Sequence, residues 1–176
     1  PEGEMLRRAL GDDNWGNWEI EDATIYHGVW LYALCGYAYA QDRMQELFKT
    51  PEMYYYAQYF LHLMSPAGMI PDFGDANWGA SWIRMIPFFE KAAAINQDPR
   101  LRWAAAQYYR EFLDPAPERK GVFTALCLSD AYLWADFDLP AEAPTSGSQE
   151  VLEDIVGKKV VFRDGWDENS TYMLYN

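Results

Sequence analysis

The chain has 176 residues, the length of one domain or of one domain with part of another. Half of its residues are hydrophobic and 17% are aromatic, which supplies a sizeable core and argues against intrinsic disorder. The formal net charge is −13, and such a field repels polyanions, so a nucleic-acid partner or an anionic membrane surface is not expected. No apolar run approaches the roughly 20 residues of a membrane span, so no membrane partner is expected.

Neither end of the chain has the features of a natural terminus. Pro1 is not an initiator methionine, and no signal peptide is visible at the start. Residues 170–176 form a strand-like run with no following partner in the sequence. We therefore expect the chain to be a piece of a longer protein.

Residues 1–139 have the pattern of a helical domain. The predicted helices cover residues 22–41, 51–64, 81–97, 99–113 and 121–135. Thr50 and Asp98 are each followed by a proline, which indicates an N-cap and a first helical position. Pro87 is expected to kink the helix that contains it. The first helix is apolar on two faces, which predicts burial between neighbours.

The pattern changes near residue 140. Residues 140–150 have the Pro, Ser and Gly content of a linker, and residues 158–163 and 170–175 then have the pattern of two strands with turn residues between them. Helices followed by strands favour two segregated domains, a helical one at 1–139 and the start of a β domain at 151–176.

A polar and aromatic loop leads directly into the first helix. The loop and the start of the helix hold Asn17, Trp18, Glu21, Tyr26 and His27. The structural interpretation is that acidic residues cap the helix and that aromatic residues, Tyr26 included, belong to the core. Flat aromatic rings beside amides and carboxylates also make a good surface for sugar rings, so these residues are candidate carbohydrate contacts.

A long loop at residues 65–80 carries the second group of candidates. Loops of this length inside a compact helical domain are usually functional. Asp75 and Trp78 lie in the loop, and Arg84 follows it with a guanidinium group suited to a carboxylate or phosphate. A structural ion pair between Asp75 and Arg84 explains the same residues equally well, and His62 is expected to be structural.

Several enzyme templates are absent from the sequence. It has no Gly-rich phosphate loop, no H-E-x-x-H and no G-x-S-x-G, and its two histidines argue against a His-rich metal site or a serine triad. Cys35 and Cys127 fall in predicted helices and are expected to be buried free thiols. No metal and no cofactor are expected. Carboxylates are abundant, so the residues alone indicate a helical carbohydrate-binding or carbohydrate-processing domain.

Three sequence motifs follow one another in order. Residues 18–26 are W-E-I-E-D-A-T-I-Y, residues 68–75 are G-M-I-P-D-F-G-D, and residues 160–172 are V-V-F-R-D-G-W-D-E-N-S-T-Y. The order resembles that of the heparinase II/III-like polysaccharide lyases and their oligoalginate lyase relatives. In that family an acidic turn precedes a Tyr, a G-x-x-P-x-x-G-D loop follows, and R-x-G-W-D recurs at the start of a β domain.

The resemblance implies an incomplete α/α toroid, followed by the opening strands of an antiparallel β-sandwich, with the active site between them. It implies β-elimination on an acidic, uronic-acid-containing polysaccharide or oligosaccharide, in the periplasm or outside the cell. By motif position Tyr26 is the catalytic residue. The candidate substrate contacts are Asn17, Trp18, Glu21, His27, Asp75, Trp78 and Arg84.

The chain also departs from the family pattern. The Asn or His that holds the substrate carboxylate would precede Pro1, and a further His or Tyr would follow Asn176, so this chain alone is expected to be inactive. Ala23 or Thr24 stands where a glycine is common. Two alternatives stay open: a non-catalytic glycan-binding or scaffold protein, and an α/α-toroid glycoside hydrolase that uses paired carboxylates. Its candidate carboxylates are Glu19, Glu21, Asp72 and Asp75.

Overall fold

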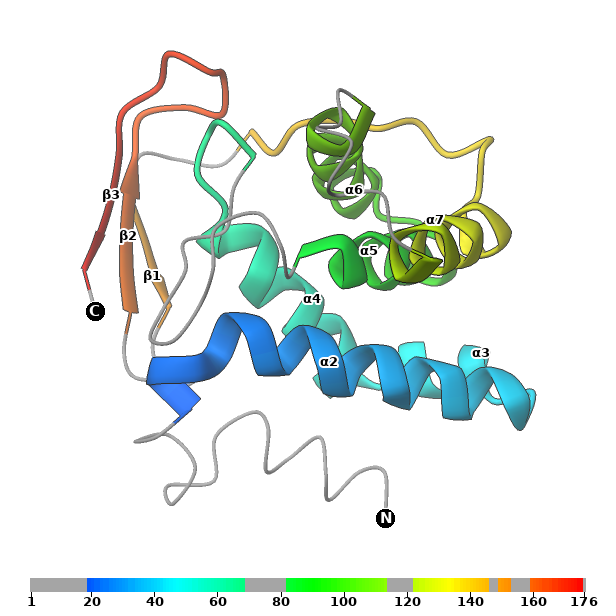
Figure 1. Cartoon of the computed structure of the whole chain (residues 1–176). Helices are drawn as coiled ribbons and strands as arrows, with labels where there is room; N and C mark the ends of the chain where they lie inside the picture. The colour runs from blue at the N-terminus through cyan, green and yellow to red at the C-terminus, as the bar shows by residue number, and fades with distance from the viewer. Residues whose placement is uncertain (1–18, 69–81, 114–121, 146–148, 153–158, 176) are drawn as a thin grey trace.

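The computed structural model describes residues 19–68, 82–113, 122–145, 149–152 and 159–175. These residues form a mainly helical protein with a small antiparallel sheet at one end (Figure 1). The helices are α2 (Glu19–Ala40), α3 (Met44–Phe48), α4 (Pro51–Leu63), the 3₁₀ turn η1 (Trp82–Arg84), α5 (Met85–Asn96), α6 (Pro99–Leu113) and α7 (Val122–Trp134). The strands are β1 (Gln149–Leu152), β2 (Lys159–Arg163) and β3 (Tyr172–Tyr175). Among these helices none combines the length and hydrophobicity that a membrane span needs.

Two helix starts follow directly from local chemistry, and both confirm the sequence prediction. The Thr50 Oγ1 accepts a hydrogen bond from the backbone N–H of Met53 at 3.3 Å, and α4 begins at the next residue, a proline. The Asp98 Oδ1 accepts from the backbone N–H of Arg100 at 3.0 Å, and α6 likewise begins at the following proline.

The region around Pro87 differs in detail from the prediction of one kinked helix. A 3₁₀ turn at Trp82–Arg84 runs into α5, which begins at Met85. Pro87 therefore lies in the first turn of α5, where backbone N–H groups have no partner within the helix. The missing N–H of the proline breaks no helical hydrogen bond there, which removes the reason for a kink.

The helix α5 is the centre of the helical layer, because it contacts each of the other described helices and η1. The core around it is rich in aromatic side chains. Those that are almost fully buried are Phe48, Tyr56, Tyr59, Phe60, Phe88, Phe89 and Tyr108. The expectation that the first helix is buried on two faces is wrong for its second half. Tyr37 and Tyr39 of α2 are more than half exposed, since periodicity alone does not show which faces receive a neighbour.

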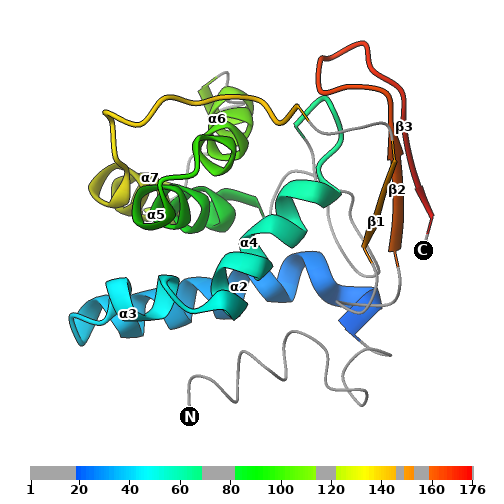
Figure 2. The same ribbon diagram turned by 180° about the vertical axis from the view of Figure 1, so that it is seen from behind.

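The three strands form one antiparallel sheet in the order β1-β2-β3 (Figure 2). In β2, Val160 pairs with Val151 of β1 and with Tyr175 of β3. Both strands predicted after residue 155 are present, and β1 is an additional strand that begins at Gln149, at the end of the stretch expected to be linker. Along β2 the side chains of Val161 and Arg163 are buried, and both views place the helices on one side of the sheet.

Candidate functional site

The residues proposed from the sequence are described only in part. Four of them lie outside the described residues: Asn17, Trp18, Asp75 and Trp78. Three belong to the first turns of α2, where the backbone is described and the side chains are not: Glu21, Tyr26 and His27. The expected proximity of Tyr26 to Asp75 therefore also lies outside the described residues. Arg84 is the one candidate whose side chain is described, and it ends the turn η1, which contacts α2, α5 and α7.

Arg84 lies in a half-buried polar cluster between these helices. Burial raises the pKa of the Cys127 thiol to about 11, although the nearby Tyr32 hydroxyl and Arg84 guanidinium oppose the shift. The Tyr32 hydroxyl donates to the Asp130 Oδ2 at 2.5 Å. Burial likewise raises the pKa of Cys35 to about 12. Both cysteines are free and buried, as expected, and their thiols stay protonated and unreactive at neutral pH.

A buried arginine of the third motif joins the sheet to the helices. Arg163 is 2% exposed, and its Nη2 donates to the backbone carbonyls of His62 and Met64, the latter at 3.0 Å. Its guanidinium carbon also lies 3.8 Å from the centroid of the Trp166 ring. These carbonyls belong to the end of α4. The third motif is therefore bound to the part of the chain that directly precedes the second motif, which begins at residue 68.

Both motifs also pack against α6. Gly68, the first residue of the second motif, has a φ of +84°, and a Cβ at this position would lie 2.4 Å from the Cβ of Gln107. Only glycine fits both the left-handed backbone and the close approach to α6. In the third motif the Trp166 ring packs edge-on against Trp103 of α6, with 5.4 Å between ring centroids. Gly68 and the third motif, about 95 residues apart in the sequence, thus pack against the same helix, α6, close to the end of α4.

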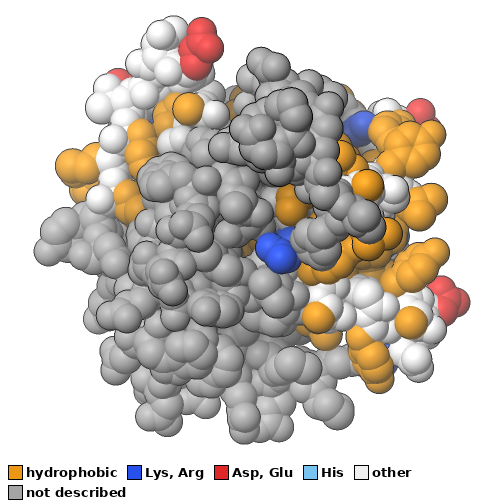
Figure 3. Space-filling view, in the orientation of Figure 1, with side chains coloured by type: hydrophobic (Ala, Val, Ile, Leu, Met, Phe, Trp, Pro, Cys, Tyr) orange, Lys and Arg blue, Asp and Glu red, His pale blue; other side chains and the backbone are white. Residues whose placement is uncertain are grey.

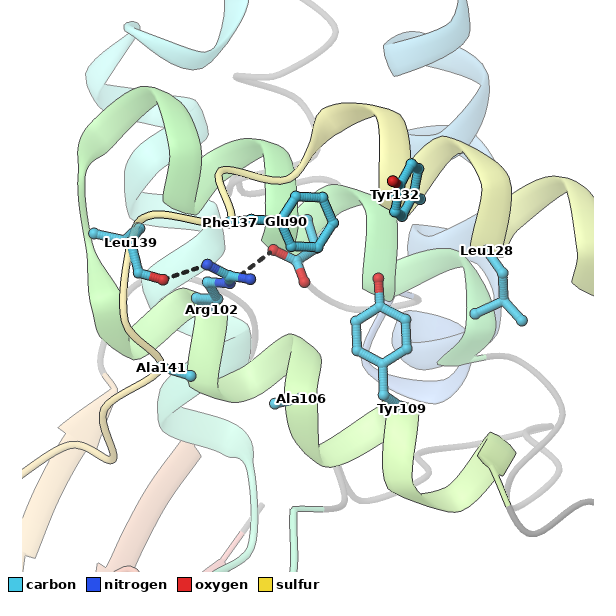
Figure 4. A pocket seen from close by; sticks show the side chains of 9 residues that line it. All are labelled: Glu90, Arg102, Ala106, Tyr109, Leu128, Tyr132, Phe137, Leu139 and Ala141. Atoms are coloured by element: carbon cyan, nitrogen blue, oxygen red, sulfur yellow. Dashed lines mark hydrogen bonds and ion pairs between the residues drawn. The ribbon is translucent and has the colours of Figure 1, made fainter.

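A pocket of about 560 Å³ uses other residues of α6 than this junction does, namely Arg102, Ala106 and Tyr109 (Figure 4). Its walls come from α5, α6, α7 and the segment that follows α7. The lining residues are Glu90, Arg102, Ala106, Tyr109, Leu128, Tyr132, Phe137, Leu139 and Ala141. The Nη1 of Arg102 donates to the backbone carbonyls of Asp136 and Leu139, which holds the segment after α7 against α6.

Glu90 is the acidic group of this pocket. It is 3% exposed, and its Oε2 lies 3.7 Å from the Nε of Arg102 with no hydrogen-bond partner among the described residues. Burial raises its pKa from about 4.5 to about 7, and the Arg102 charge opposes the shift only in part. Burial also raises the pKa of the Tyr109 hydroxyl, with a smaller contribution from the charge of Glu90. A carboxyl group with a pKa near 7 can donate or accept a proton at neutral pH.

Comparison with protein-family models, curated proteins and solved structures finds no match to this chain. The functional argument therefore depends on the motifs and on the geometry. Within the described residues there is also no group of three or more His, Cys, Asp or Glu side chains placed to hold a metal ion.

Sequence reasoning missed the pocket around Glu90 and Arg102. One signal was present: Glu90 and Lys91 are the only charged residues in the sequence of α5, so an acid stands in an otherwise apolar helix. The signal did not show which other segments face this acid. Tertiary contacts hold the segment after α7 beside it: Arg102 donates to two backbone carbonyls of the segment, and the Glu142 N–H donates to the Pro99 carbonyl.

Proposed function

We propose that this chain belongs to a lyase that cleaves a uronic-acid-containing polysaccharide by β-elimination. The observation that carries the proposal is the order of the three motifs, together with the packing of Gly68 and of Trp166 against α6 and the anchoring of Arg163 at the end of α4. In both views the amino-terminal end of α2, which carries Tyr26, lies at the end of the molecule that holds the sheet (Figures 1 and 2). The described parts of the three motifs are thus consistent with one site between helices and sheet.

The proposal includes the finer architecture and the location that the resemblance implies. The described helices then belong to an α/α toroid with its boundary near residue 139, and the strands open a β-sandwich after a linker at 140–150. The protein is then periplasmic or secreted, and its partner is an acidic polysaccharide or oligosaccharide.

The reaction requires a positioned acid and base. A base removes the proton from C5 of the uronate, and the freed electron pair forms the C4–C5 double bond. The bond between C4 and the glycosidic oxygen breaks, and an acid protonates the departing oxygen. Neutralisation of the substrate carboxylate makes the C5 proton removable, for which Arg84 is a candidate. Tyr26 is the proposed acid, and its phenol serves as base if a nearby cation lowers its pKa.

The test is Tyr26→Phe in the longer protein that we expect to contain this chain. The variant should lose about a hundredfold to ten-thousandfold of the rate, because that is the usual contribution of general acid–base catalysis. Its stability should fall by only about 1 kcal/mol, the value of one hydrogen bond. Tyr37→Phe, an exposed position on the same helix, is the matched control and should retain full activity.

The readout separates the proposal from its alternatives. Elimination produces a C4–C5 unsaturated uronate that absorbs ultraviolet light, and hydrolysis does not. Cleavage without this absorbance would support the glycoside hydrolase instead, and wild-type elimination by Tyr26→Phe would show that Tyr26 is only structural. The pocket around Glu90 gives the hydrolase little support. A glycosidase needs two facing carboxyl groups, and Glu90 is the only carboxylate among the residues that line this pocket.

A further inference from the structure

The pocket around Glu90 contains none of the residues that the lyase proposal uses. Its volume of about 560 Å³ falls in the range of about 300–1,000 Å³ that is typical of small-molecule sites. Aliphatic and aromatic side chains form most of its walls, and its charged groups, Glu90 and Arg102, are gathered at one point. A mostly apolar pocket with a few convergent polar groups is typical of a ligand-binding site.

Its polar centre is a buried carboxyl group without its full set of partners. Glu90 is almost fully buried, and its Oε2 lies 3.7 Å from Arg102, beyond the usual hydrogen-bond distance. Figure 4 shows this carboxyl group pointing toward Arg102, with the hydroxyl end of Tyr109 on its other side. An unsatisfied buried acceptor is energetically unfavourable. A ligand hydroxyl that donates to the Glu90 carboxyl group supplies a hydrogen-bond partner to this buried acid.

Exposed aromatic rings border the same pocket. Tyr132 is 68% exposed and Phe137 is 59% exposed, with ring centroids 5.1 Å apart and ring planes inclined at 49°. Figure 3 shows hydrophobic side chains gathered over the part of the surface where Figure 1 places α5 and α7. Solvent-exposed aromatic faces beside a concave site offer a platform for the C–H face of a flat ring.

The charges of the pocket decide which class of ligand fits. An anion is disfavoured because the carboxyl group lies in the pocket and the Arg102 guanidinium is already engaged by Glu90 and by two backbone carbonyls. An organic cation is disfavoured because the Arg102 guanidinium, 3.7 Å from the Glu90 carboxyl group and 5.2 Å from the Phe137 ring centroid, already places a positive charge beside both groups. A wholly apolar ligand leaves the buried acceptor unsatisfied. A neutral ring fits these features, because its edge hydroxyls can donate to Glu90 and its apolar face can lie against Tyr132 and Phe137.

We propose that this pocket is a binding site for a neutral pyranose sugar, with Tyr132 and Phe137 as the aromatic platform and Glu90 as the acceptor of a sugar hydroxyl. The site is separate from the lyase motifs and does not depend on the lyase proposal. It gives the protein a means of holding an uncharged sugar on a face that carries none of the proposed catalytic residues.

The experiment is titration of the chain with the methyl glycosides of glucose, galactose and mannose, followed by NMR. Methyl glucuronide is the anionic counterpart. At least one neutral glycoside should bind with a dissociation constant in the millimolar range. Tyr132→Ala and Phe137→Ala should each weaken this binding at least tenfold, and Glu90→Gln should weaken it less. Both aromatic positions are mostly exposed, so neither change should prevent folding. Tyr37→Ala, an exposed tyrosine outside the pocket, is the matched control and should bind normally.

Each other outcome overturns the proposal. These outcomes are no binding of any neutral glycoside, binding that Tyr132→Ala and Phe137→Ala leave unchanged, or a glucuronide that binds more tightly than the neutral glycosides and is released by the same two changes. The ultraviolet elimination assay serves as an independent measurement. If the lyase proposal fails, the glycoside titration is unaffected, and if this proposal fails, elimination by Phe137→Ala still reports on the lyase.

Discussion

Glu90→Gln should make the protein more stable at alkaline pH than the wild type. Folding places the Glu90 carboxyl group in a site where its pKa is about 7, against about 4.5 for a glutamate in water. The folded state therefore binds a proton more tightly than the unfolded state does. The favourable contribution of the protonated group is fully present below about pH 4.5 and is lost as the pH rises through about 7. Glutamine keeps the shape of the side chain and does not ionise.

The size of the effect follows from the two pKa values. They differ by about 2.5 pH units, and each unit corresponds to about 1.36 kcal/mol, so the total is about 3 kcal/mol. About 2–3 kcal/mol of this stability difference is lost by the wild type between pH 5 and pH 8.5. The group faces Arg102 and Tyr109 of α6 and Tyr132 of α7.

The measurement is urea unfolding of the wild type and of Glu90→Gln at several pH values from 5 to 8.5. The difference in free energy of unfolding between the two proteins removes the contribution of the net charge of −13, which both proteins feel almost equally. Glu142→Gln, an exposed glutamate, is the control and should show a constant difference from the wild type. A Glu90→Gln difference that stays constant across the range would refute the reasoning.

Two further changes test the anchors of the fold. Arg163→Met should lower the free energy of unfolding by about 3 kcal/mol, because it removes charged hydrogen bonds to one buried and one partly buried carbonyl. Chemical denaturation measures this loss, and a value below about 1 kcal/mol would contradict the anchoring role. Asp98→Asn should cost about 1–2 kcal/mol at neutral pH. Burial alone would raise the pKa of Asp98, but hydrogen bonds from Arg100 and Tyr54 hold it below its usual value. The stability that Asp98 contributes is therefore lost as the pH falls below the ordinary range of aspartate, and the two proteins should become equally stable in acid. A difference that persists in acid would rule out the ionised carboxylate as its source.

The helix boundaries that could be predicted are those set by neighbouring residues. Thr50 and Asp98 satisfy the first N–H groups of their helices, and the following prolines suit the first helical position, so both starts are local properties of the sequence. The short helix at Met44–Phe48 was not predicted, because one and a half turns carry too little periodicity. The strand at Gln149–Leu152 was not predicted either, because its pairing depends on β2, which lies further along the chain.

The candidate sites were predictable only as far as motifs mark them. The arginine and glycine of the third motif were recognisable in the sequence, but their role in joining the sheet to α4 became visible only from the contacts of Arg163. The pocket around Glu90 could not be predicted, because its walls come from three helices and a coil segment that no local pattern brings together.

The guanidinium of Arg163 has a consequence for the cooperativity of unfolding. Its carbonyl partners lie at the end of α4, and the neighbouring Tyr172 of β3 donates to the Leu63 carbonyl at 2.8 Å. When the sheet separates from the helices, these acceptors lose their donors and the Trp166 ring loses its contact with Trp103 of α6 at once. The three strands therefore cannot melt as an independent unit at low cost. The helical layer and the sheet should lose structure in a single transition, with amide hydrogen exchange in β2 as slow as in α4.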